Sequence, residues 1–178
     1  MPDLGHLGVG AAITFPLLAA LSLGLITLVS DARPSERLVR TTIGAGLIGS
    51  LLASVVVLFA WSGVVGAPVR GEVSFGSWLR VGSYEIPALA NIDLTAVTLS
   101  VLGALLTWLV SRFSHTYLHK EPGFNRFFVL LALFACGLQL VAFAGALDLF
   151  FAGWELLGIS SAPGRWRRCT RAAFRRAA

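Results

Sequence analysis

Residues 41–69 read TTIGAGLIGSLLASVVVLFAWSGVVGAPV, a run of 29 residues that holds no charged side chain. A helix needs about 20 mainly apolar residues to cross a bilayer. This run therefore predicts a membrane-spanning helix, and residues 6–28, where only His6 could carry a charge, predict another. The whole chain is 56% hydrophobic and 13% charged, whereas soluble domains are about 25% charged. We interpret it as a membrane protein.

Four apolar blocks predict complete transmembrane helices, and a fifth block begins near Leu149. The four blocks are residues 7–29, 42–67, 94–110 and 127–147. A single helix over residues 127–162 would be about 54 Å long, well beyond the thickness of a bilayer. We therefore expect a turn at Gly145 and Asp148, with Asp148 capping the next helix. The predicted fold class is all-α, a polytopic transmembrane helix bundle of four complete helices and a truncated fifth.

The segment between the second and third helices has the pattern of β-structure. Residues 72–75 and 78–81 alternate in polarity, and Gly76, Gly82 and Pro87 interrupt them. This pattern predicts a short extramembrane β-hairpin. The expected division of the chain is 1–67 for the first two helices, 68–91 for the hairpin loop, 92–162 for helices three to five and 163–178 for a basic tail.

Charged residues in the connecting loops predict the orientation, because Lys and Arg favour cytoplasmic loops. The first and third loops carry six of these residues, and the second carries two, Arg70 and Arg80. We therefore expect a multi-pass protein of the inner (plasma) membrane with its N-terminus outside. Only Asp3 and His6 precede the first apolar run. That run does not fit a signal peptide, which begins with a basic region.

The arginine-rich tail accounts for the positive charge of the chain. Residues 165–176 carry six Arg and no acid, so the net charge of +5 would be −1 without them. We expect residues 163–178 to be an out-of-frame or artificial end, and the chain to be the N-terminal fragment of a longer protein. The alternative is a small membrane scaffold whose native basic tail binds anionic lipid, at about 1 kcal/mol for each Arg. Nucleic-acid binding is not expected, because no fold for it accompanies the arginines.

Three motifs in the second half of the chain carry a family resemblance. They are SRFSHTYL at residues 111–118, EPGFNRFF at residues 121–128 and GWELLG at residues 153–158. Together with Asp93 at the start of the third helix, they resemble the L subunit of bacterial NADH-quinone oxidoreductase (respiratory complex I) and its relatives. Those relatives are Mrp-type cation/proton antiporters and the membrane subunit of inorganic-carbon uptake complexes. The resemblance covers about residues 70–162.

The resemblance implies the N-terminal part of an antiporter-like subunit that couples electron transport to proton transfer. It implies no cofactor in this chain, since NADH, flavin, iron-sulfur centres and quinone bind other subunits of such a complex. The implied partners are other membrane subunits, the lipid bilayer, and protons or other monovalent cations. Whether the chain belongs to an enzyme stays open, because it has no redox site of its own. Family members carry Asp-Asn before the fifth helix, where this chain has Gly145 and Ala146.

Glu155 is the first candidate for the proton path. It lies in an apolar run and has no basic residue within nine positions on either side, and an ionised carboxylate in hydrocarbon costs at least about 2.5 kcal/mol. By resemblance, the matching glutamate relays protons with a lysine on a later helix, which this chain does not contain. A structural hydrogen bond to a neighbouring helix is the alternative. Asp148, seven residues earlier on the same helix face, is either a helix cap or the point where protons enter.

Other polar residues have simpler interpretations. Asp93 is expected to cap the third helix, with a role in proton transfer as the alternative. His115 and His119 have the spacing of paired metal ligands, but no third ligand accompanies them. We therefore expect a solvated cytoplasmic loop rather than a metal site, with a proton-collecting antenna as the alternative. Cys136 and Cys169 match neither a zinc site nor a disulfide framework.

Small and polar residues on the second and fourth helices predict close packing. Gln139 is expected to bond to a neighbouring helix. Gly44, Gly46 and Gly49, together with Ser50 and Ser54, form a stripe of small residues that predicts a close helix contact.

Overall fold

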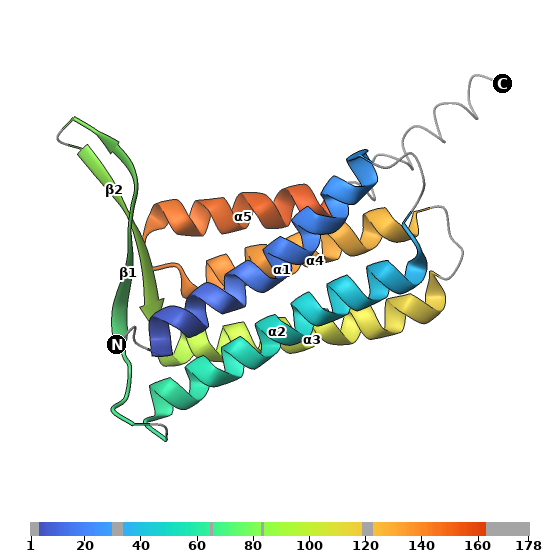
Figure 1. The fold of residues 1–178 in the computed structure, drawn as a ribbon. Helices are drawn as coiled ribbons and strands as arrows, with labels where there is room; N and C mark the ends of the chain where they lie inside the picture. The colour runs from blue at the N-terminus through green and yellow to red at the C-terminus, as the bar shows by residue number, and fades with distance from the viewer. Residues whose placement is uncertain (1–3, 30–33, 65, 83, 119–122, 163–178) are drawn as a thin grey trace.

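The computed structural model describes residues 4–29, 34–64, 66–82, 84–118 and 123–162, which form a helix bundle with a hairpin at one end (Figure 1). The elements are α1 (Leu4–Val29), α2 (Glu36–Ser62), β1 (Gly71–Val81), β2 (Tyr84–Ile92), α3 (Leu94–Tyr117), α4 (Phe124–Phe143) and α5 (Leu147–Ser161). The first four helices are long and apolar enough to cross a membrane. The predicted helix bundle with a hairpin between its second and third helices is confirmed, and the chain is a multi-pass membrane protein.

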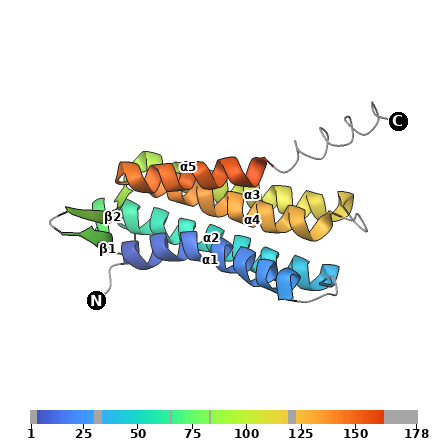
Figure 2. The same ribbon diagram turned by 90° about the horizontal axis from the view of Figure 1, so that it is seen from above.

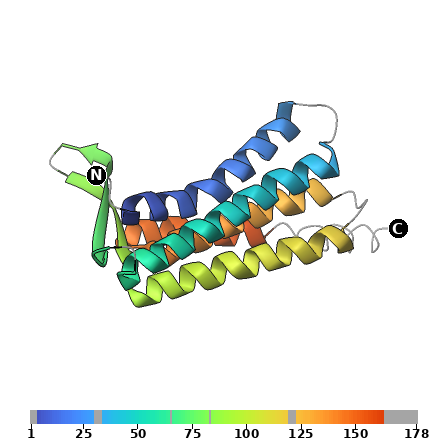
Figure 3. The same cartoon turned by 60° about the horizontal axis from the view of Figure 1, so that its bottom comes forward.

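The helix α4 lies at the centre of the bundle. It packs against α1, α2 and α3 on one side and carries α5 on the other, so α5 covers the outside of α4 (Figure 2). The hairpin lies at the end of the bundle where α1, α3 and α5 begin. The ends of α1 and α3 and the starts of α2 and α4 lie at the opposite end (Figure 3). Arg37, Arg40, Arg112 and Arg126 lie in these helix ends and therefore share one end of the bundle. The side of the membrane that this end faces stays a prediction.

The helices α2 and α3 are longer than their apolar blocks. Ser35 caps α2 by accepting a hydrogen bond from the backbone N–H of Leu38 at 3.3 Å, and Gly63 ends the helix with a φ of 76°. At the end of the bundle where α2 begins, α3 continues to Tyr117. The predicted start of the second helix was therefore too late and the predicted end of the third too early, because arginines at the end of a membrane helix reach water without interrupting the backbone hydrogen bonds. At its other end α2 stops at Ser62, five residues before the end of its apolar block. Arg40 and Arg112 consequently lie on helices rather than in loops.

The hairpin is confirmed, but its two strands differ from the two predicted segments. Both segments belong to β1, which pairs antiparallel with β2 through partners such as Glu72 with Asn91 and Arg80 with Glu85. Gly76 has a φ of 91°, and the register shifts around it. A glycine in this left-handed region produces a β-bulge instead of ending the strand. The chain reverses only at Gly82.

The stripe of small residues on α2 packs against α1 at two of its three glycines. A Cβ atom at Gly46 would lie 2.6 Å from the Cβ of Ala19, and one at Gly49 would lie 2.9 Å from the ring of Phe15. The predicted close contact is therefore confirmed there. Gly44 is the exception, because a Cβ at this position would have no neighbour within 4 Å.

Candidate functional site

The GWELLG motif at residues 153–158, which contains Glu155, packs α5 closely against α4. A Cβ atom at Gly153 would lie 2.9 Å from the backbone nitrogen of Val141, and one at Gly137 would lie 3.0 Å from the carbonyl oxygen of Gly153. Only glycine at both positions permits this approach of the two backbones. Two residues along a helix are about 200° apart around its axis. Because Gly153 faces α4, Glu155 faces away from it.

The outward face of α5 is apolar around a single pair of carboxylates. Trp154 is 60% exposed, Ile159 is 61% exposed, and Glu155 and Asp148 are also exposed. Seven residues make nearly two full turns, so Asp148 and Glu155 share this face. Among the described residues, none forms an ion pair or side-chain hydrogen bond with Glu155. The alternative of a structural hydrogen bond to a neighbouring helix therefore finds no partner within the described bundle.

Asp148 does not cap α5, and this expectation was wrong. The helix begins at Leu147, with Ala146 at the N-cap and no side-chain cap bond, so Asp148 lies inside the first turn. The turn comes at Ala144 to Ala146 because α4 ends at Phe143. An aspartate in the first turn is favoured by the helix dipole. No described residue pairs with its carboxylate, which leaves it available for another role.

The hairpin fixes where α5 begins. The backbone N–H of Gly145 donates a 2.9 Å hydrogen bond to the carbonyl oxygen of Leu89, and Ala144 forms a β-bridge with Ala90. A Cβ atom at Gly145 would lie 2.9 Å from the backbone carbon of Ala90. This close approach accounts for a glycine at this position. The strand β2 thus anchors the helix that carries Glu155.

Asp93 caps α3 as predicted. Its Oδ1 accepts a 2.7 Å hydrogen bond from the backbone N–H of Ala96, and its Oδ2 accepts a 3.2 Å bond from the side-chain amide of Asn91. Both carboxylate oxygens therefore have structural partners. A role for Asp93 in proton transfer stays a prediction.

Gln139 joins three helices through a buried network, whose partners the sequence did not reveal. Ser100 on α3 donates a 2.6 Å hydrogen bond to Oε1 of Gln139, and Nε2 of Gln139 donates a 3.2 Å bond to the carbonyl oxygen of Ser100. Ser54 on α2 lies 2.8 Å from the hydroxyl of Ser100. Ser50 extends the network to α1 by donating a 2.7 Å bond to the carbonyl oxygen of Ala12. The predicted bond from Gln139 to a neighbouring helix is confirmed.

His115 lies on α3 and not in a solvated loop, so that expectation was wrong. Its ring stacks on Phe128 of α4, with ring centroids 4.2 Å apart. His119 and Cys169 lie outside the described residues, and Cys136 is a buried free thiol in α4. Within the described ranges, no three His, Cys, Asp or Glu residues are grouped so as to hold a metal ion.

Residues 78–128 match the sequence profile of the family described as NADH-Ubiquinone oxidoreductase (complex I), chain 5 N-terminus. They include the end of β1, all of β2 and α3, and the start of α4. NADH-ubiquinone oxidoreductase chain 5 of Candida parapsilosis is 28% identical over 90 residues, which are 51% of this chain and 16% of that protein.

Two mammalian proteins of the same name are also similar to this chain. Chain 5 of Sus scrofa is 32% identical over 89 residues, 50% of this chain and 15% of that protein. Chain 5 of Bos indicus is 25% identical over 123 residues, 69% of this chain and 19% of that protein. The alignments thus span less than a fifth of the length of these relatives. Over this part of its length, the chain is thus similar to the N-terminal region of chain 5 of complex I.

Proposed function

We propose that this chain supplies the N-terminal helices of a proton-translocating, antiporter-like membrane subunit of an NADH-quinone oxidoreductase-type complex, with Glu155 on its proton path. The observation that carries this proposal is the outward position of Glu155, set by the contact of Gly153 with α4. The similarity to chain 5 of complex I favours this function over an Mrp-type antiporter or an inorganic-carbon uptake complex.

The surroundings of Glu155 require a partner outside the described helices. Trp154 and Ile159 beside it are exposed and apolar, so the outer face of α5 suits lipid or another helix. An ionised carboxylate facing lipid costs at least about 2.5 kcal/mol, and such groups face protein or water instead. A cationic side chain on a further helix would meet this need. By resemblance, that group is a lysine.

The chemistry of this face is the carriage of protons without a covalent step. Glu155 takes up a proton when its cationic partner moves away and releases it when the partner returns, because an opposite charge favours the ionised form. Asp148 lies about 10 Å nearer the hairpin end along the helix axis. Water between the two carboxylates would complete the connection.

The same proposal assigns the partners and the location of the chain. Other membrane subunits of a respiratory complex would cover α5, and NADH, flavin, iron-sulfur centres and quinone would bind those other subunits. The proposed location is the plasma membrane, with the N-terminus and the hairpin outside. Arg37, Arg40, Arg112 and Arg126 on the helix ends at the opposite end of the bundle support this orientation.

The test is a Glu155→Gln variant in the assembled complex. In inverted membrane vesicles, we expect the number of protons translocated per NADH oxidised to fall several-fold, because glutamine has the same shape but carries no proton. Glu85→Gln is the matched control, since Glu85 is an exposed glutamate of the hairpin. An unchanged proton yield in Glu155→Gln would contradict the proposal and favour a membrane scaffold. Asp148→Asn in the same assay shows whether protons enter through Asp148.

A further inference from the structure

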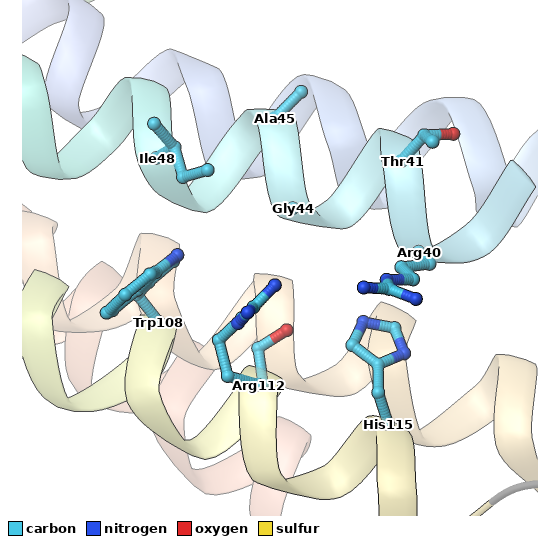
Figure 4. A pocket seen from close by; sticks show the side chains of 9 residues that line it. Arg40, Thr41, Gly44, Ala45, Ile48, Trp108, Arg112 and His115 are labelled. Atoms are coloured by element: carbon cyan, nitrogen blue, oxygen red, sulfur yellow. The ribbon is translucent and has the colours of Figure 1, made fainter. Parts of the chain in front are cut away.

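A groove of about 340 Å³ opens between α2 and α3 at the end of the bundle opposite the hairpin (Figure 4). Arg40 on α2 and Arg112 on α3 extend toward each other across it, and His115 lies beneath the guanidinium of Arg40. Neither arginine has an ion-pair partner among the described residues, and no acidic side chain lines the groove. Glu36, one turn before Arg40 on α2, acts on His115 by its charge but does not line the groove. The charged groups that line the mouth are therefore the two arginines.

The wall of the groove becomes apolar toward the middle of the bundle. Gly44, Ile48 and Trp108 line this part. Ile48 lies about 12 Å from Arg40 along the axis of α2. The lining of the groove therefore changes from charged to apolar over less than the thickness of one bilayer leaflet. Gly44 leaves the wall open, because a Cβ there would have no neighbour within 4 Å. A ligand that fits this gradient has an anionic head and a hydrocarbon tail.

A contact between α3 and α4 fixes the position of His115 at the charged end of the groove. His115 stacks on Phe128 of α4, and Arg112 is one turn before it on α3. Guanidinium groups bind phosphate oxygens through paired, charge-assisted hydrogen bonds. Basic pockets between transmembrane helices are also the places where anionic lipid head groups bind.

We infer that this groove binds one anionic phospholipid, whose phosphate contacts Arg40 and Arg112 and whose acyl chain lies along Gly44, Ile48 and Trp108. The phospholipid fills the space between α2 and α3 and joins them at this surface. This inference does not depend on the proposed proton path, because the groove and Glu155 lie on different helices.

The experiment measures lipid binding by the full chain in nanodiscs of phosphatidylcholine with a minor fraction of phosphatidylglycerol. Native mass spectrometry counts the phosphatidylglycerol molecules that stay bound after release from the nanodisc. Arg40→Gln and Arg112→Gln should each lower this retention about fivefold. Arg37→Gln is the matched control, because Arg37 lies one turn before Arg40 but does not line the groove. This control should retain the lipid.

A second pair of variants tests the acyl-chain part without changing charge. Gly44→Leu should fill the groove and lower retention, whereas Gly24→Leu on α1, where a Cβ also meets open space, should not. Helix content by circular dichroism confirms that each variant folds. Equal losses in Arg37→Gln and Arg40→Gln would overturn the inference, since general surface charge would then suffice. Displacement of the lipid by inorganic phosphate would overturn it too, because a free anion would then be the ligand.

Discussion

Gln139 in α4 and Glu155 in α5 are both polar residues in apolar helices, but the bundle treats them differently. Gln139 is 1% exposed and bonds to Ser100 through both of its side-chain groups. Glu155 is exposed, and no described residue pairs with it. The interior network is thus complete within the first four helices, whereas the face of α5 is incomplete.

The difference separates polar groups that build the fold from those that need a partner. A closed network contributes to helix packing at about 0.6 to 2 kcal/mol for each membrane hydrogen bond. It has no free group that could accept a proton from outside. An unpaired carboxylate contributes nothing to this packing and is available for chemistry. The following substitutions test that distinction.

The largest expected effect comes from Gly153→Leu, which would push α5 away from α4. A Cβ at this position meets backbone and side-chain atoms of Leu140 and Val141 at 2.9 Å. Overpacking of this kind costs about 1–3 kcal/mol. The free energy of unfolding in mixed SDS and dodecyl maltoside micelles measures the loss. Gly158→Leu is the control, because a Cβ there would have open space, and an equal loss in both variants would contradict this packing.

Gln139→Leu should remove the centre of the buried network while keeping a similar volume. We expect a loss of up to about 2 kcal/mol in the same unfolding assay. The double variant Gln139→Leu with Ser100→Ala should lose less than the sum of the two single variants, because both remove the same hydrogen bonds. Strict additivity would show that the two side chains do not stabilise the bundle together.

Asp93 and Glu155 allow a direct comparison of two carboxylates. Asp93→Ala should lower the free energy of unfolding by about 1 kcal/mol, the usual cost of losing a helix N-cap. Glu155→Ala should leave it unchanged in the isolated chain, because no described residue bonds to Glu155. A clear loss in Glu155→Ala would show that this residue is part of the packing after all.

The smallest effect is expected in the hairpin. Arg80 lies 2.8 Å from Oε1 of Glu85, and its guanidinium lowers the pKa of that carboxyl, as does a hydrogen bond with Ser77. Arg80→Ala should therefore raise the pKa of Glu85 toward its ordinary value, which carbon NMR of the labelled carboxyl measures. An unchanged pKa would mean that the contact does not form in solution.

The same pair has a defined pH dependence. Because the folded-state pKa of Glu85 lies below the unfolded value, any stabilisation is present above the unfolded pKa. It is lost as the pH falls through the folded pKa. Both side chains are exposed, so solvent screening should keep this contribution below what the unfolding assay detects.

Part of the candidate site could be predicted from the sequence. The apolar blocks located the helices, the run around Glu155 singled out that residue, and Asp93 was identified as a cap. The groove of Arg40, Arg112 and His115 could not be found in this way. The three residues come from two helices that are about 70 residues apart in the chain. The arginines also lie beyond the apolar blocks, where hydropathy assigns them to loops.

The sequence alone determined that the chain crosses the membrane several times, because hydropathy depends only on local composition. It also determined that Glu155 needs a special environment, because a charge in an apolar run is costly wherever the helix lies. Only the tertiary structure decided which way Glu155 faces, since that depends on the contact between Gly153 and the backbone of α4. The partners of Gln139 and the place of Gly145 beneath β2 were decided in the same way. Such contacts join residues far apart in the chain, and no local pattern records them.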